Sequence, residues 1–185
     1  MLIKPDVNRF AKIKVLGLGG GGSNALNSMI TAAQIQGVDF IAVNTDQQHL
    51  LASQAQTKVQ IGQNLTKGLG TGADPQIGEK AAQESLENIK EVIVGADMVF
   101  LTYGAGGGTG TGAGPVIADL AHKLNILTVA VITKPFAFEG TRRMVVAEEG
   151  IMNLRDKVDT LIVIPNQKLL EIVDKNLSLI EAFRL

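Results

Sequence analysis

The chain contains no cysteine, two histidines and few aromatic side chains. Without cysteine it cannot form a disulfide, present a thiolate nucleophile or bind zinc through sulfur. His49 and His122 are too few for most metal sites. The lack of disulfides favours a reducing compartment, so the sequence predicts a cytoplasmic protein.

An excess of charge is also missing, with 17 basic and 18 acidic residues among 185. This balance argues against nucleic-acid binding, which usually produces a basic surplus. The apolar runs have the length of strands, far below the ~20 residues of a membrane helix. The first twelve residues lack the apolar core of a signal peptide. We therefore expect a soluble protein with no nucleic-acid partner and no direct membrane insertion.

Short apolar, β-branched runs alternate with segments of helical spacing along the chain. Strands are expected at 13–19, 39–46, 58–62, 97–103, 126–136 and 159–166, and helices at 23–34, 46–54, 75–95, 115–125 and 141–158. Asp74 with Pro75 and Gly114 with Pro115 resemble helix starts, and Gly95 resembles a helix end. The alternation predicts a Rossmann-like α/β fold, a doubly wound and mainly parallel sheet of about six strands with helices on both faces.

Three glycine-rich loops follow predicted strands, at 17–24, 68–75 and 104–114. Carboxyl ends of parallel strands share one edge of a sheet, where ligands bind. The third loop places seven of the 21 glycines in eleven positions, which indicates unusual dihedrals or close approach to a ligand. Backbone N–H groups at helix starts bind anions, and Thr109 and Thr111 add hydroxyl groups. The loops therefore predict a polyphosphate site.

Other functions also fit parts of this pattern. Gly17, Gly19 and Gly22 form G-x-G-x-x-G and, with Asp46, would suit an oxidoreductase that uses a nicotinamide cofactor. That reading leaves 106–112 unexplained. A scaffold protein with a structural nucleotide is a second alternative. No G-x-x-x-x-G-K-[ST] motif occurs, so the chain is not a P-loop NTPase, and backbone N–H groups, helix dipoles and Mg²⁺ would meet the phosphate charge.

The sequence resembles the tubulin/FtsZ family of GTPases from about residue 10 to its end. The segment "GGGTGTG" at 106–112 matches the family signature, and "FIAVNTD", "LTKGLGTGADP", "TKPFAFEGTRRM" and "EAFR" follow the family order. The resemblance implies a cell-division protein that assembles head-to-tail into the cytokinetic ring and hydrolyses GTP at subunit junctions. It implies GTP or GDP and Mg²⁺ as ligands.

The resemblance also assigns residues. The nucleotide-binding positions it implies are Gly19, Gly20, Gly21, Gly22, Ser23, Asn24, Asn44, Gly72, Ala73, Gly106, Gly107, Gly108, Thr109, Gly110, Thr111, Glu139, Arg143, Asn166 and Phe183, with Asp46 near the metal. Ala73 would approach the γ-phosphate, Asn166 would read guanine and Phe183 would pack on the base. Glu139 and Arg143 would hold the ribose. Structural roles are the alternatives: an exposed i, i+4 ion pair for Glu139 and Arg143, a turn at Asn166 and a core position for Phe183.

The predicted organisation is an N-terminal extension at 1–12, a GTP-binding domain at 13–176 and the start of a truncated central helix at 177–185. The family continues with another base contact, an acidic catalytic loop and a C-terminal domain, all absent from this sequence. We therefore expect no catalytic residue here, and binding without hydrolysis by this chain alone. Expected partners are a further copy, full-length family members, the C-terminal half with its catalytic loop, and other division proteins at the division site.

Overall fold

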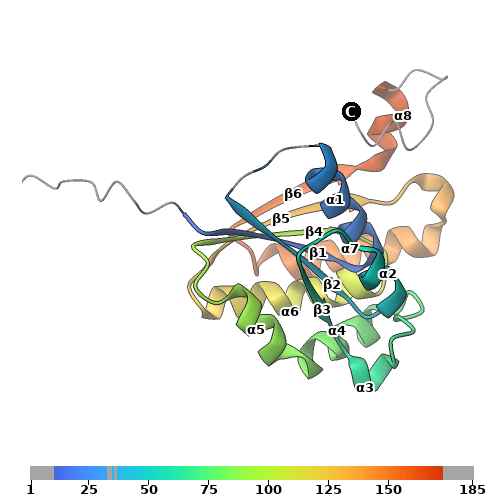
Figure 1. The fold of residues 1–185 in the computed structure, drawn as a ribbon. Coiled ribbons are helices and arrows are strands. Elements are labelled where there is room, and N and C mark those ends of the chain that lie inside the picture. The colour runs from blue at the N-terminus through green and yellow to red at the C-terminus, as the bar shows by residue number, and fades with distance from the viewer. Residues whose placement is uncertain (1–10, 33–34, 36, 173–185) are drawn as a thin grey trace, which may run out of the picture.

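A computed structural model of the chain describes residues 11–32, 35 and 37–172. In that part, six parallel strands form one sheet (Figure 1). The strands are β1 (Ile13–Leu18), β2 (Val38–Asn44), β3 (Thr57–Gln60), β4 (Met98–Gly104), β5 (Leu127–Lys134) and β6 (Thr160–Pro165). The strand prediction is confirmed in number, order and direction.

The strand order is β3-β2-β1-β4-β5-β6. The chain runs outward from β1 to β3 and then returns to β4 on the other side of β1, where Leu16 lies in register with Leu101. The order reverses between β1 and β4. In doubly wound sheets the crevice beyond the carboxyl ends at such a reversal is the place where ligands bind.

Helices cover both faces of the sheet, as predicted (Figure 1). They are α1 (Gly19–Ala32), α2 (Gln47–Ala52), α3 (Gln63–Thr66), α4 (Pro75–Glu84), α5 (Leu86–Ile93), α6 (Thr109–Lys123), α7 (Thr141–Arg155) and α8 (Leu169–Ile172), with short 3-10 turns η1 (Ala137–Glu139) and η2 (Asn166–Lys168). One core cluster packs α1 and α2 against one face of the sheet. A larger cluster packs the helices α4, α5, α6 and α7 against the opposite face. Neighbouring residues of one strand serve opposite cores, as Val15 and Leu16 do.

The starts of α1 and α6 differ from the prediction. Both helices begin inside the glycine loops, at Gly19 and Thr109, so Pro115 lies within α6 and not in its first turn. Helix propensity disfavours this glycine-rich start. Packing overrides it, because the helix lies directly on the ring of Tyr103: a Cβ on Gly110 or Gly114 would come within 2.7 Å of that ring or its Cβ.

The predicted helix 75–95 is two helices, α4 and α5, separated at Ser85. The Ser85 hydroxyl accepts a hydrogen bond from the Gly62 N–H at 2.9 Å, which ties the break to the loop before α3, itself unpredicted. The expected ends are confirmed. Asp74 caps α4 by accepting from the Gln76 N–H, and Gly95 follows α5 with φ of 74°.

Within the described ranges, no helix is long and apolar enough to cross a membrane. The proposed extension at 1–12 and helix start at 177–185 lie almost wholly outside the described residues, which begin at 11 and end at 172.

Candidate functional site

Two glycine loops face each other at the carboxyl ends of β1 and β4. A Cβ on Gly21 would lie 3.2 Å from the Gly104 nitrogen, and a Cβ on Gly19 would lie 3.2 Å from the Thr109 Cβ. These loops are the starts of α1 and α6, which have 14 and 15 residues. Two helix N-termini therefore converge at one point, where their unpaired N–H groups and dipoles favour an anion.

The glycines of these loops do two different jobs. Gly22, Gly108 and Gly110 are buried, and a Cβ on any of them would collide with Thr102, Thr71 or Tyr103. Gly106 is also buried and has φ of 88°, and its Cβ would lie 2.5 Å from the Arg143 carbonyl oxygen. Close packing therefore requires glycine at these four predicted binding positions.

Fewer glycines of these two loops have free space or solvent beside them. A Cβ on Gly20 would meet nothing within 4 Å, and the nearest atom to a Cβ on Gly107 would lie 3.8 Å away. Gly21 is exposed. Their backbone N–H groups are the ones that a ligand in this crevice could approach.

A cavity of about 810 Å³ extends from the Gly21 loop toward β5 and β6. Its lining contains Gly21, Asn24, Ala25, Ser28, Gly104, Ala105, Thr133, Pro135, Phe136, Phe138, Glu139, Arg143 and Asn166. Five residues predicted for the nucleotide are therefore brought together from α1, from the segment after β5 and from the end of β6. The volume suits a small-molecule ligand.

The segment after β5 is held in shape by Glu139. One carboxylate oxygen accepts the Phe136 N–H at 2.8 Å, and the other lies 3.1 Å from the Arg143 guanidinium. The rings of Phe136 and Phe138 stack with centroids 4.9 Å apart. Glu139 thus organises this wall of the cavity, and Arg143 is the cation of the lining.

A hydrogen bond joins this wall to the end of β6. The Gln167 side-chain oxygen accepts the Ala137 N–H at 3.1 Å. Gln167 follows Asn166, so the bond connects η1 to η2. Sequence reasoning missed Gln167, Phe136 and Phe138, although their position after β5 or β6 at the ligand edge was a usable signal.

Three buried polar atoms near this edge lack a partner in the described structure: the Ser23 hydroxyl, the Asn44 Nδ2 and the Asn166 Oδ1. Asn44 uses its Oδ1 to accept the Asp46 N–H at 3.2 Å. Asn166 is 8% exposed and lines the cavity. Since buried polar groups are nearly always paired, these atoms point to a ligand that supplies the missing bonds.

The hydroxyls of Thr109 and Thr111 each contact another group of the protein. The Thr109 Oγ1 lies 2.8 Å from the Thr45 Oγ1, and the Thr111 Oγ1 accepts the Gly106 N–H at 3.0 Å. Thr111 is buried and faces away from the large cavity. Thr45 was not among the predicted positions.

Gly72 and Ala73 lie in a loop of unusual backbone conformation. Positive φ angles occur at Lys67, Gly68, Gly70, Gly72 and Ala73. Both predicted residues are exposed and outside the cavity lining. The loop nonetheless touches the glycine loop before α6, since Thr71 packs where a Gly108 Cβ would stand.

Asp46 caps α2 with the carboxylate predicted for the metal. It accepts the His49 N–H at 3.1 Å and contacts the His49 ring at 3.3 Å. These contacts, led by the backbone hydrogen bond, hold the pKa of Asp46 below its ordinary value. Among the residues that the structure describes, no three His, Cys, Asp or Glu side chains are grouped to bind a metal ion.

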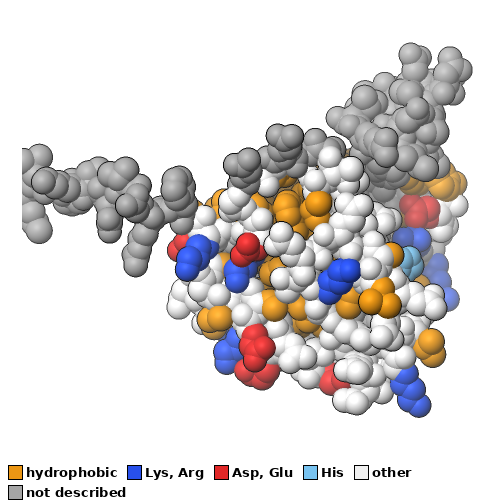
Figure 2. Space-filling view, in the orientation of Figure 1, with side chains coloured by type: hydrophobic (Ala, Val, Ile, Leu, Met, Phe, Trp, Pro, Cys, Tyr) orange, Lys and Arg blue, Asp and Glu red, His pale blue; other side chains and the backbone are white. Residues whose placement is uncertain are grey.

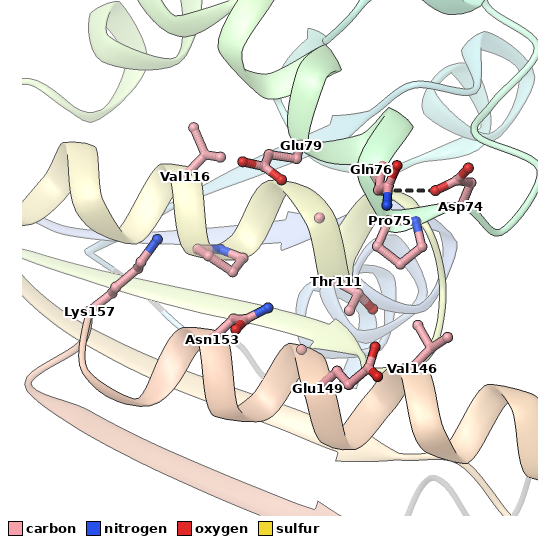
Figure 3. A pocket seen from close by; sticks show the side chains of 13 residues that line it. Asp74, Pro75, Gln76, Glu79, Thr111, Val116, Val146, Glu149, Asn153 and Lys157 are labelled. Atoms are coloured by element: carbon pink, nitrogen blue, oxygen red, sulfur yellow. Dashed lines mark hydrogen bonds between the residues drawn. The ribbon is translucent and has the colours of Figure 1, made fainter.

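A second cavity, of about 540 Å³, lies between α4, α6 and α7 (Figure 3). Glu79 and Glu149 stand on opposite walls, and Thr111 is the predicted residue that lines it. It shares no lining residue with the first cavity. Phe183 lies outside the described residues, so its place relative to either cavity is not defined.

A parallel, doubly wound sheet with a cavity at its reversal defines an α/β protein that binds its ligand beyond the strand ends. Within that class, the model of the Tubulin/FtsZ family, GTPase domain, matches residues 12–174. The chain belongs to this family of GTPases, and the resemblance stated from the sequence is confirmed.

Similar proteins support the assignment. The chain is 57% identical over 174 residues to the cell division protein FtsZ of Coxiella burnetii, a match that covers 94% of this chain and 45% of that protein. It superposes on an empty FtsZ dimer structure from M. jannaschii with a TM-score of 0.89 and 47% identity, covering 98% of this chain and 55% of the other. The chain thus spans about half the length of these relatives.

More distant proteins share the fold. CetZ2 from Haloferax volcanii, described as a GTPγS-bound protofilament, matches with a TM-score of 0.82 and 24% identity, covering 93% of this chain and 53% of that one. At this identity the likeness extends to the fold alone.

Proposed function

We propose that this chain binds GDP or GTP in the large cavity and is the GTP-binding domain of a cell-division GTPase. The unpaired Asn166 Oδ1 is the observation that carries the proposal. A carbonyl oxygen has two lone pairs. Guanine presents two adjacent donors on one edge, N1–H and the N2 amino group, which suit that oxygen. Leaving such a buried acceptor unpaired favours the ligand that satisfies it.

We propose that the nucleotide lies along the cavity in one orientation. The base lies toward Asn166 and the sugar toward Glu139 and Arg143. The phosphates extend to the open N–H groups near Gly20, Gly21 and Gly107. The loop with Gly72 and Ala73 reaches the terminal phosphate through its contact with Gly108. The remaining predicted glycines, with Ser23, Asn24 and Asn44, shape or flank this path.

Mg²⁺ is the metal that fits this donor set. It commonly binds through one or two carboxylates together with substrate phosphates and waters. Asp46 supplies one carboxylate at the end of β2, and we propose it as the protein ligand. When bound, the metal would neutralise phosphate charge. Asp46 also caps α2.

Calorimetric titration of nucleotide-stripped chain with GTP, GDP, ATP and NADH, each with and without Mg²⁺, tests the binding. We expect guanine-selective affinity. Asn166→Leu removes the acceptor and should weaken GDP binding about 5- to 150-fold, the cost of about 1–3 kcal/mol for a lost partner. Asn153→Leu, in the second cavity, is the control that should bind GDP like the wild type.

Two results would reject the proposal. Preferential binding of NADH would support the oxidoreductase alternative, and equal loss in both leucine variants would remove Asn166 from the base site.

We propose further that the chain alone does not hydrolyse GTP. Among the described residues that line the large cavity, Glu139 is the one carboxylate. Both of its oxygens already have partners within the protein. Phosphoryl transfer also needs a group that orients the attacking water. A steady release of phosphate by concentrated chain, above that of buffer, would contradict this.

Head-to-tail assembly is the last part of the proposal. A heterologous contact that does not close produces a filament, and relatives are described as a dimer and a protofilament. We propose that this chain adds to filaments of a full-length relative in the cytoplasm, at the division site with other division proteins. A molar excess should shorten such filaments in sedimentation, and unchanged filaments would argue against it. Turnover restored by adding the C-terminal half would exclude a purely structural nucleotide.

A further inference from the structure

Thr45 lies behind the proposed phosphate site and lines neither cavity. It follows β2 and is 0% exposed. Its hydroxyl oxygen lies 2.8 Å from that of Thr109, the first residue of α6. Thr109 is 8% exposed and adjoins Gly19 of the first loop. One buried hydroxyl therefore touches the residue that starts the helix nearest the phosphates.

The pair has two possible directions, because either hydroxyl can donate. A phosphate oxygen only accepts. A phosphate at the start of α6 would therefore accept a hydrogen bond from the Thr109 hydroxyl, and that hydroxyl would in turn accept one from Thr45. Hydrogen bonds in such a chain polarise and strengthen one another in a buried setting.

Thr45 is itself held in place. Its carbonyl oxygen accepts the Thr66 hydroxyl at 3.3 Å, and Thr66 also bonds the Gly62 carbonyl at 2.9 Å. The neighbouring Gln47 N–H donates to the Gly68 carbonyl at 3.1 Å. The Thr45 hydroxyl thus stands at a fixed point beside Thr109.

We propose that Thr45 is a positioning residue that orients the Thr109 hydroxyl toward the nucleotide phosphates. The inference rests on the proposed guanine-nucleotide site. It assigns Thr45 no contact with the ligand.

The test measures the affinity of the 185-residue chain for guanosine, GMP, GDP and GTP. Thr45→Val keeps the shape and removes the hydroxyl, and we expect about ten-fold weaker binding of GDP and GTP with guanosine unchanged. Thr45→Ser keeps the hydroxyl and should restore binding to within about two-fold of wild type. Those factors correspond to roughly one hydrogen bond.

Thr128→Val is the matched structural control. It removes a hydroxyl that is equally buried, with Thr128 0% exposed, and that donates to the Ile126 carbonyl at 3.0 Å, outside the network around Thr45 and Thr109. We expect a lower melting temperature with unchanged GDP affinity. A general loosening of the loops would weaken GDP binding in this variant too, and would overturn the inference.

A double-mutant cycle tests the route through Thr109. Thr109→Val removes the hydroxyl that donates a hydrogen bond to the phosphates, so adding Thr45→Val should cause no further loss of GDP affinity. Thr45→Ala replaces Thr45→Val in the cycle if the valine variant does not fold.

The remaining outcomes are distinguishable. A wild type that binds none of the four ligands overturns the proposed function and this inference together. A wild type that binds GDP, with Thr45→Val equal to it or weakened equally for guanosine, overturns the inference alone.

Discussion

Tyr103 combines a buried ring with a hydroxyl that has no partner in the described structure. The side chain is 2% exposed, and burial raises its pKa. A buried donor without an acceptor costs free energy that phenylalanine would not. The Tyr103 hydroxyl therefore lowers the free energy of unfolding of the chain.

Tyr103→Phe should stabilise the chain by about 1 kcal/mol, seen as a melting temperature higher by ~2–4 °C. The pH dependence follows from the raised pKa. The folded tyrosine keeps its proton above the unfolded pKa of 10.0, so wild-type stability falls as pH rises past 10. The variant lacks this contribution, and its advantage in denaturant melts should grow between pH 9 and 11. A constant advantage would mean that Tyr103 ionises without unfolding.

Asp46→Asn separates capping from metal binding. Asparagine also caps helices well, so the melting temperature without ligand should change little. The lost charge should reduce the gain in GDP affinity produced by Mg²⁺, measured by calorimetry. If Mg²⁺ strengthens GDP binding equally in both chains, Asp46 is a helix cap only.

At the scale of elements, α6 and α7 approach each other closely at Thr111 and Gly150. A Cβ on Gly150 of α7 would collide with the Thr111 methyl of α6, while the Thr111 hydroxyl holds the Gly106 N–H. The same threonine thus sets the distance between two helices and the shape of the glycine loop.

Gly150→Ala should destabilise the chain by about 1–3 kcal/mol, the usual effect of overpacking. Adding Thr111→Ser removes the obstructing methyl and keeps the hydroxyl, so the double variant should regain most of the loss in urea melts. Additive losses would show that the two helices do not meet at this pair.

The elements also show what sequence can predict. All six strands were found because β-branched apolar runs are hard to mistake. The starts of α1 and α6 were missed, since glycine and Pro115 argue against a helix unless tertiary packing is known. For the same reason the sequence could not separate Gly108, which packs against Thr71, from Gly107, which is open.

At the scale of the whole molecule, charges of both signs are dispersed over one face (Figure 2), while the edge strand β6 exposes two isoleucines. Lys and Arg stand among Asp and Glu on the face shown in Figure 2. Ile162 and Ile164 of the edge strand β6 are 47% and 40% exposed. Edge strands with apolar side chains favour association.

The isolated chain should therefore associate as its concentration rises, in sedimentation velocity experiments. Replacing Ile162 and Ile164 together with threonine keeps β-branching and should reduce this association. Leu51→Thr, an exposed residue of α2, is the control that should leave it unchanged. Equal association in all three chains would place the contact elsewhere.

The gathering of the glycine loops at one edge of the sheet was predictable from the order of loops and strands, and the family from the glycine signature. Thr45 and Gln167 were not, because a buried hydroxyl pair and a bond between two loops depend on contacts distant in sequence.

The loop from Lys67 to Ala73 has a chemical consequence of its own. Five of its residues have positive φ, and Lys67 and Ala73 do so without being glycine. Such angles are disfavoured for L-residues and natural for their mirror images. In a chain made by peptide ligation, D-alanine at position 73 would adopt φ of 64° as its preferred geometry. This loop is thus a place where reversed chirality would rigidify the backbone.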